Sequence, residues 1–317
     1  MSADPATPDA WDALAHRHRQ TLLVRGYSVR TLATVGTYAR RWAEFCAEVS
    51  LDAPAAVTTE HVASFQQWLW HRPTHRGAAR GVASQNNVLA WVKGFFDWLQ
   101  AEGVLTRNPA TAAFYAKQPD ALPKDVLTQA EAVAILEAPD ARTAKGQRDR
   151  AILETMYATG LRRAELRALE VADVDLDSEL LTVRRGKGGK GRVVPLTRTA
   201  CAALEDYLRT TRLTLLGGIE SARLFVSPVN HPGEDFCLGE HALGNLVARY
   251  AKAAGVKKKV TPHLWRHTCA THLLQNNANV RHVQELLGHK CLATTERYLR
   301  LTISDLKEAH RRHHPRG

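Results

Sequence analysis

Apolar side chains recur with the period of an α-helix through the first 107 residues, and this repeat constrains the fold more than any other feature of the chain. One periodic stretch follows Ser28, a residue type that often caps helices, a second opens at Thr59 and a third at Ser84. Together with the segment around Trp11, they predict four helices. Six of the seven tryptophans of the chain lie in this region. We expect most of them to form the core of a small helical bundle rather than to stack on nucleic-acid bases.

A proline-containing segment without helical period separates this bundle from the rest of the chain. It spans residues 108–125 and contains three prolines. Such a composition favours an exposed connector, so we expect the domain boundary here. The predicted domains are a helical bundle at residues 1–107 and a second domain at residues 126–317, with residues 108–125 as the linker.

The second domain mixes helices with two short β-rich runs. The runs Leu180–Arg185 and Arg192–Leu196 flank Gly186–Gly191, whose glycines are typical of a tight hairpin turn. Helical periods lie on both sides of the hairpin. The whole chain is therefore predicted to be mostly α with a small antiparallel β-sheet, as an N-terminal helical bundle followed by an α+β domain.

The charge of the chain is positive and unevenly spread. Lys and Arg number 43 against 32 Asp and Glu, a net charge of +11, of which residues 1–110 carry only +2. Between His241 and Gln284 the sequence holds no acidic residue, whereas a solvated surface usually mixes both signs. We interpret this segment as an anion-binding surface of a protein with a polyanionic partner. Its basic residues are Arg249, Lys252, Lys257, Lys258, Lys259, Arg266 and Arg281.

The cysteines and the first residues bear on the compartment. An odd number of cysteines without a C-x-x-C pair forms neither a disulfide framework nor a zinc-finger pattern, which indicates a reducing environment. The N-terminus lacks both a basic start and an apolar run, and no stretch has the length of apolar residues that a membrane span needs. We expect a soluble, cytoplasmic protein without a membrane partner. The cysteines are Cys46, Cys201, Cys237, Cys269 and Cys291.

Two arginines are predicted at the starts of helices. Gly160 follows a helical period as a C-terminal glycine does, so Arg162 begins the next helix, where backbone N–H groups and the helix dipole favour an anion. The residues before His263 are typical of a helix start, and Arg266 then lies one turn after it on the same face. An imidazole and a guanidinium can converge there on one group. Arg162 taken alone is a weak signal, because arginines are common at helix starts and an ordinary surface residue would fit as well.

Three further polar residues follow from turn and helix-end signals. Lys187 lies in the glycine-rich turn, from which a long cationic side chain can reach a neighbouring cleft, although a lone lysine in such a turn is more often solvent-exposed. An apolar period that stops at Gly288 leaves His289 just past a helix end. Tyr298 follows nine residues later.

The order and spacing of these residues carry a specific resemblance. The sequence contains A-T-G-L-R-R-A-E-L at 158–166, G-K-G-G-K-G-R-V-V-P-L at 186–196, H-L-W-R-H at 263–267, L-G-H at 287–289, and Tyr298. In this order they resemble the tyrosine recombinase, or phage integrase, family of site-specific DNA recombinases. The resemblance covers the domain from about residue 124 and, more loosely, the N-terminal bundle, which is similar to the family's core-binding domain. Trp265 and Cys269 differ from the residues usual in the family, at positions without a catalytic role.

The resemblance implies an active site and a reaction. Attack of a tyrosine on a DNA phosphate would leave a 3′-phosphotyrosine and expel a 5′-hydroxyl, which needs a proton as it leaves. Lys187 is the candidate acid, and His263 and His289 are candidates for the proton of the tyrosine. Because the phosphotyrosine ester retains the energy of the broken bond, neither ATP, a metal nor another cofactor is expected. The family's active-site set would be Arg162, Lys187, His263, Arg266 and His289, with Tyr298 as nucleophile and Glu165 as support for the first arginine.

The same resemblance implies partners. They are double-stranded DNA with inverted half-sites, and a homotetramer on synapsed DNA or a heterotetramer with a paralogue. In the family, the segment after the nucleophile packs into a neighbouring protomer, although here its small apolar face fits docking on its own domain as well. The task is open between chromosome-dimer resolution of the Xer type and recombination for a transposon, plasmid or integrative element.

Several other interpretations compete with a recombinase. His263 and His267 have the spacing of zinc ligands on a helix, with Cys269 or His272 nearby, but no adjacent glutamate completes a zinc-protease motif. A two-metal nuclease needs clustered carboxylates, and the basic segment from His241 to Gln284 contains none. A non-catalytic DNA-binding protein would explain the charge but not all six site residues. A type IB topoisomerase-like enzyme would share the chemistry, but the separate helical domain and the short tail after Tyr298 argue against it.

Overall fold

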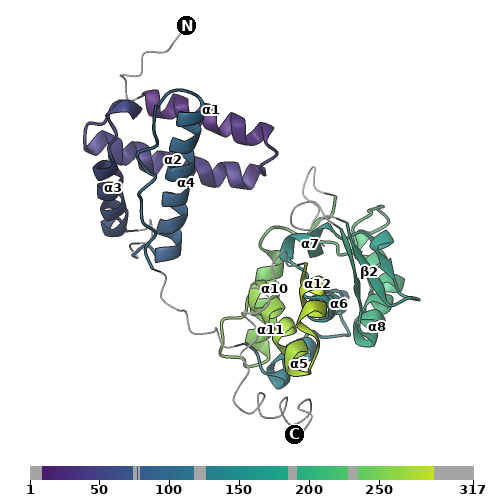
Figure 1. The fold of residues 1–317 in the computed structure, drawn as a ribbon. Coiled ribbons are helices and arrows are strands. Elements are labelled where there is room, and N and C mark those ends of the chain that lie inside the picture. The colour runs from purple at the N-terminus through teal and green to yellow at the C-terminus, as the bar shows by residue number, and fades with distance from the viewer. Residues whose placement is uncertain are drawn as a thin grey trace, which may run out of the picture. The chain divides into compact units, whose positions relative to one another are not determined.

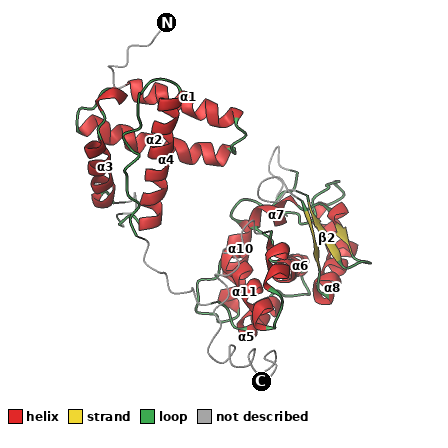
Figure 2. Cartoon of the chain, in the orientation of Figure 1, coloured by secondary structure: helices red, strands yellow, loops and turns green. Residues whose placement is uncertain are grey.

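The structure is a computed structural model that describes residues 9–73, 77, 79–117, 126–184, 191–227 and 235–288 (Figure 1). The chain divides between Pro123 and Lys124 into two compact units, each with its own hydrophobic core. Helices predominate among the described residues, and the strands form one small antiparallel sheet (Figure 2). The predicted fold class is confirmed.

The described residues of the first unit form a bundle of four α-helices, as the apolar period predicted. Ser28 caps α2 as expected, because its hydroxyl accepts a hydrogen bond of 3.2 Å from the backbone N–H of Thr31. α3 begins at Thr59 as expected, with Thr58 as its N-cap, and α4 begins at Val82, two residues before Ser84. The helices are α1 (Asp9–Val24), α2 (Val29–Glu48), α3 (Thr59–His71) and α4 (Val82–Ala101), and a 3-10 turn (Pro54–Ala56) precedes α3.

Aromatic side chains fill the centre of this bundle. Trp42 is 1% exposed, and its ring lies edge-on to Phe65 and Phe96, with centroids 4.9 and 5.3 Å away. The indole N–H of Trp11 donates a 2.7 Å hydrogen bond to the carbonyl of Leu51 and so ties α1 to the segment after α2. The interpretation of most tryptophans as core residues is therefore correct. Trp11, Trp42, Trp91 and Trp98 are buried, Trp68 is half-buried and Trp70 is exposed.

His18 on α1 is buried among aromatic rings of α4. Its ring centroid lies 5.1 Å from that of Trp98 and 5.4 Å from that of Phe95, and the residue is only 6% exposed. Burial, with a smaller contribution from the Arg25 cation, lowers the pKa of this imidazole from 6.5 to about 4. His18 is therefore neutral in the folded bundle at pH 7.

Acidification is expected to destabilise the bundle through His18. Below pH 6.5 the imidazole of His18 takes up a proton in the unfolded chain but stays neutral in the folded chain down to a pH of about 4. The folded bundle therefore has its full stability above pH 6.5 and loses stability as the pH falls toward about 4. Lowering the pH from about 7 to about 5 should cost about 2 kcal/mol through this group. Urea unfolding followed by tryptophan fluorescence should show a shallower pH dependence in His18→Phe than in the wild type. His16→Gln, at an exposed histidine of the same helix, is the control, and a His18→Phe profile identical to the wild type would contradict the assignment.

Part of the predicted connector belongs to the bundle. Residues 108–117 lie along α4 and contribute to the bundle core, so the bundle extends beyond its predicted end. Asn108 is buried, and its amide donates a 2.6 Å hydrogen bond to a carboxylate oxygen of Asp97. Asn86 both donates to and accepts from the backbone of the same segment. Side chains of α4 thus satisfy the backbone of a stretch without regular structure. The remainder of the predicted connector, residues 118–125, lies outside the described residues.

The second unit surrounds α6 with other helices and carries the sheet at one side (Figure 2). α6 packs against α5, α8 and α11, and residues on all of its faces are buried. The helices are α5 (Gln129–Glu137), α6 (Ala144–Thr159), α7 (Arg163–Ala168), α8 (Arg198–Asp206), α9 (Arg212–Leu216), α10 (Ala242–Ala253), α11 (Pro262–Gln275) and α12 (Val280–Leu287), with a 3-10 turn (Val171–Asp173) and a π-helical turn (Tyr207–Thr211).

The sheet confirms the predicted hairpin and orients one arginine. Strands β1 (Val174–Asp175), β2 (Leu180–Val183) and β3 (Arg192–Pro195) are antiparallel in that order. Leu181 pairs with Val194, and Val183 pairs with Arg192. Since Leu181, Val183 and Val194 are buried, Arg192 occupies an inward-facing position of the sheet. The hairpin tip, residues 185–190, lies outside the described residues.

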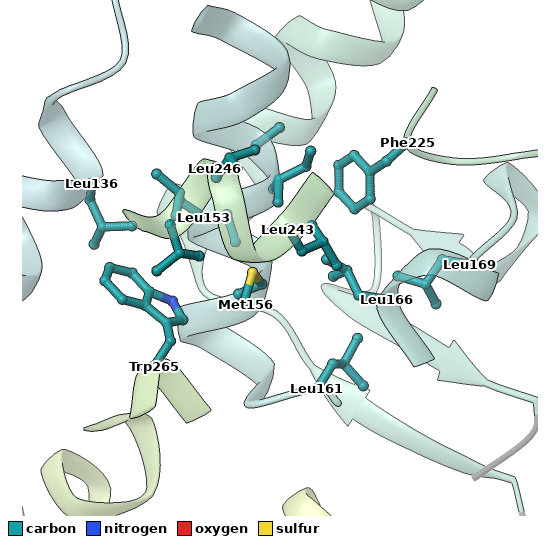
Figure 3. Close-up of a cluster of buried hydrophobic side chains, with 14 of the residues drawn as sticks. Leu136, Leu153, Met156, Leu161, Leu166, Leu169, Phe225, Leu243, Leu246 and Trp265 are labelled. Atoms are coloured by element: carbon teal, nitrogen blue, oxygen red, sulfur yellow. The ribbon is translucent and has the colours of Figure 1, made fainter. Parts of the chain in front are cut away.

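Trp265 anchors α11 in the core of the second unit. It is fully buried, and Figure 3 shows its indole near Leu136 of α5 and near Leu153 and Met156 of α6. This packing fixes the helix that carries His263 and Arg266 against the central helix of the unit.

Candidate active site

The end of α6 and the start of α7 position Arg162. Gly160 ends α6 in the left-handed conformation, with φ of 57°, and a Cβ there would lie 2.7 Å from a methyl group of Leu287. The left-handed backbone therefore favours glycine here, and a larger residue would also have to displace the side chain of Leu287 on α12. Arg162 is the residue that precedes α7, as predicted, and its side chain is 29% exposed.

Glu165 holds Arg162 in place. One carboxylate oxygen accepts a 2.8 Å hydrogen bond from Arg162 Nη1, and the other accepts a 2.9 Å bond from the Arg162 backbone N–H. Burial alone would raise the pKa of this carboxyl group, but hydrogen bonds from Arg192 and Arg162 outweigh it and hold the pKa below its ordinary value. Glu165 is therefore ionised at neutral pH, and it contacts the first arginine as the family resemblance implied.

Arg266 reaches the same region from α11. The hydroxyl of Thr261 accepts a 3.2 Å hydrogen bond from the backbone N–H of Leu264, which confirms the predicted helix start. Arg266 is 5% exposed. Its guanidinium donates to the carbonyl of Gly160 and, over 2.6 Å, to the carbonyl of Leu287.

The C-terminal end of α12 is where three arginines converge. Arg192 Nε donates to the carbonyl of Leu286 over 2.9 Å. Arg266 donates to the next carbonyl, that of Leu287, and Arg162 donates over 3.1 Å to the one after, that of Gly288. Three consecutive carbonyls at the negative end of a helix dipole thus gather three cations. We call Arg162, Arg192 and Arg266 the arginine cluster.

Two members of the arginine cluster were predicted from the sequence, and Arg192 was not. Arg162 and Arg266 are far apart in the chain, and the structure brings them together. Arg192 was assigned only to a β-rich run. One feature of the sequence could have singled out Arg192. It alternates with Val193 so that it lies on the same face of its strand as the apolar Val194, which is buried, and a charged residue on that face needs a partner.

The remaining predicted site residues are described in part. His263 is exposed on the first turn of α11, one turn before the buried Arg266. Lys187, His289 and Tyr298 lie outside the described residues, the first between β2 and β3 and the other two after Gly288.

The zinc interpretation of α11 does not fit its side chains. Both ring nitrogens of His272 bind protein groups, Nδ1 at 2.7 Å from the Tyr157 hydroxyl and Nε2 at 2.8 Å from the carbonyl of Leu127. Burial raises the pKa of the Cys269 thiol to about 12, which disfavours the thiolate that zinc binds. Across the described part of the chain, no group of three or more His, Cys, Asp or Glu side chains could hold a metal ion.

The acid-free segment is only partly an open basic surface. Lys258 pairs with Glu131 over 2.7 Å, and Arg249 lies 3.6 Å from a carboxylate oxygen of Asp149. Acidic residues from distant parts of the sequence therefore neutralise some of its charge. The exposed basic residues are Arg249, Lys252, Lys257, Lys259 and Arg281.

Comparison with known proteins identifies the family. Residues 125–304 match the phage integrase family. Tyrosine recombinase XerC 2 of Ralstonia nicotianae is 38% identical to the chain over 321 residues, which cover 98% of this chain and 91% of that protein. The chain belongs to the phage integrase family. Tyrosine recombinase XerD of Pseudomonas putida is 40% identical over 234 residues, with 74% of this chain and 76% of that protein covered.

Solved structures of the phage integrase family share this fold. XerA recombinase has a TM-score of 0.50 and 27% identity, covering 96% of this chain and 99% of that chain. XerH bound to a palindromic difH substrate has a TM-score of 0.69 and 23% identity, covering 88% and 79%. The chain is a tyrosine-type, site-specific DNA recombinase, an enzyme that cleaves and rejoins DNA strands. Neither a non-catalytic DNA-binding protein nor a topoisomerase-like enzyme gains support from these relatives. No helix in the described ranges is long and apolar enough to cross a membrane.

Proposed function

We propose that this recombinase cleaves one strand of duplex DNA by attack of Tyr298 on a phosphodiester held by Arg162 and Arg266. The observation that carries the proposal is the convergence of these two arginines on neighbouring carbonyls at the end of α12. Two guanidinium groups so close together can neutralise the charge that grows on the non-bridging oxygens in the pentacovalent transition state. The sequence continues from this helix end to His289 and Tyr298.

Histidine and lysine side chains carry out the two proton transfers of the reaction. A phenol with an ordinary pKa of about 10 is ionised to roughly one part in a thousand at pH 7, a cost of about 4 kcal/mol. His263 or His289 accepts that proton as the bond from the tyrosine oxygen to phosphorus forms. Lys187 donates a proton to the 5′-oxygen as its bond to phosphorus breaks. The product is a 3′-phosphotyrosine, and a 5′-hydroxyl from another strand reverses the step without ATP or a metal.

The N-terminal bundle supplies further contacts to DNA. Arg40, Arg41, Arg72 and Arg80 line one pocket on its surface, together with Glu44. Burial is the main cause that lowers the pKa of Arg41, and the neighbouring Arg80 cation lowers it further. A DNA phosphate in this pocket would reduce the repulsion between the arginines. Because such contacts are electrostatic, we expect the affinity for DNA to fall as the salt concentration rises.

The partners are double-stranded DNA with two inverted half-sites and other recombinase subunits. The assembly on synapsed DNA is a homotetramer or a heterotetramer with a paralogue. In support, relatives of this chain include proteins named XerC and XerD in the same species, Ralstonia nicotianae. A lambda integrase tetramer bound to a Holliday junction shares the fold at 20% identity. The reaction belongs in the cytoplasm, because these relatives are bacterial and bacterial DNA lies there.

Covalent capture tests the proposed reaction. The purified chain is incubated with a library of randomised nicked duplexes, and the protein–DNA adducts that survive SDS are isolated and sequenced. We expect adducts whose DNA holds two inverted half-sites, at equal yield with EDTA and with Mg²⁺, and a linked peptide that contains Tyr298. DNA that is bound but never joined to the protein would contradict the cleavage reaction.

A further inference from the structure

Arg192 joins two other elements of the candidate site to its own strand. Its two terminal nitrogens donate to the two carboxylate oxygens of Glu165, over 3.1 and 2.8 Å. Its Nε donates to the carbonyl of Leu286 at the end of α12. The side chain is 13% exposed and that of Glu165 is 4% exposed, so this fork is largely shielded from water. One side chain therefore ties the turn-proximal end of the β2–β3 hairpin to both α7 and α12.

Gly288 packs directly against this guanidinium. A Cβ at Gly288 would lie 3.2–3.3 Å from Nη1, Cζ and Nε of Arg192. Its φ of 63° also lies in the left-handed region that favours glycine. The flat face of Arg192 thus supports the backbone at the point from which the chain continues to His289.

Charge gives Arg192 a second effect on Arg162. Glu165 is shared between two arginines, so the three groups together retain one positive charge. Without Arg192, Glu165 and Arg162 would form a neutral pair, and Arg162 would attract a phosphate less strongly. The buried carboxylate would also lose its bidentate partner and the main support of its orientation.

We propose that Arg192 is a positioning residue for DNA cleavage. It fixes Arg162 through Glu165 and holds the end of α12 that leads to His289 and Tyr298. It also anchors the strand that follows the Lys187 turn, so one guanidinium coordinates the three parts of the site that come from separate segments of the sequence. This role rests on the cleavage function proposed above.

The hairpin offers a matched control in Arg184. This residue follows Val183, the strand partner of Arg192, at the end of β2. It also pairs with carboxylates, those of Glu170 and Asp173, at 2.9 and 2.5 Å. Both of these carboxylates lie outside the arginine cluster and its partner Glu165. Arg184→Ala therefore removes an arginine–carboxylate anchor from the same hairpin without disturbing the arginine cluster.

The test compares single-turnover cleavage at saturating concentrations of a captured, nicked DNA site. Arg192→Ala should lower the rate of covalent adduct formation about 100-fold, as a misplaced reacting group does. Its affinity for the site should stay within about 3-fold of the wild type, because other phosphate contacts dominate binding. Arg184→Ala should cleave within about 3-fold of the wild type. Arg192→Lys, which keeps the charge but not the fork, should cleave at a rate between those of Arg192→Ala and the wild type.

The pH profile separates positioning from a loss of folding. In Arg192→Lys the Glu165 carboxyl loses its bidentate partner, so its pKa rises and cleavage should decline at a higher pH on the acid side than in the wild type. A merely structural role predicts a lower rate with an unchanged profile, or equal losses in Arg192→Ala and Arg184→Ala, and either result would overturn the proposal. A wild type that forms no adduct would instead refute the cleavage function itself.

Discussion

Tyr298→Phe is expected to abolish the covalent protein–DNA adduct while leaving DNA binding within about 3-fold of the wild type. The substitution removes one oxygen, the atom that is proposed to form the bond to phosphorus, and no other hydroxyl on the same side chain can replace it. Phosphate contacts from arginines and lysines supply most of the affinity and remain in place. The measurement is the yield of SDS-resistant adduct on a nicked DNA site, beside a gel-shift titration of the same DNA.

Tyr27→Phe is the matched control for this prediction. Tyr27 is 49% exposed on the N-terminal bundle and belongs to none of the family motifs. It undergoes the same loss of a hydroxyl, and we expect its adduct yield to equal that of the wild type. An adduct that persists at wild-type yield in Tyr298→Phe would show that another residue is the nucleophile.

Features set by neighbouring residues were predictable from the sequence. The cap at Ser28, the helix start at Thr261 and the left-handed end of α6 at Gly160 depend on side chains or backbone conformations within one turn. The order of the motifs likewise identified Arg162 and Arg266 as candidate site residues. Local physical chemistry and motif order therefore account for the fold class and for two members of the arginine cluster.

Features that depend on distant partners were not predictable in this way. Arg192 acquires its role from Glu165 and from the end of α12, which only the folded chain brings to it. The segment after Asn108 lacks periodicity, so nothing in its pattern reveals that side chains of α4 satisfy its backbone. In the sequence nothing distinguishes Lys258 from the other basic residues of its segment, but in the fold it forms an ion pair with Glu131. In each case the deciding contact joins segments whose proximity is a property of the tertiary fold.

Arg266→Ala is expected to reduce single-turnover cleavage by at least about 100- to 1,000-fold at saturating DNA, with near-normal affinity for the site. Removal of one preorganised donor to a developing oxyanion typically costs this much. The measurement is the rate of adduct formation together with the dissociation constant for the same DNA. Equal loss of cleavage and of binding would point to a role in DNA binding alone.

The burial of Arg266 requires a control for stability. Its guanidinium joins the carbonyl of Gly160 to that of Leu287, and alanine leaves both without this donor, at about 1–3 kcal/mol for each group. Arg167→Ala is a suitable match, because Arg167 is half-buried and its Nε donates a 2.6 Å hydrogen bond to the carbonyl of Leu238. We expect both variants to lower the unfolding temperature, whereas only Arg266→Ala loses cleavage. If Arg167→Ala lost cleavage to the same degree at the same unfolding temperature, reduced stability rather than the missing guanidinium of Arg266 would explain the effect.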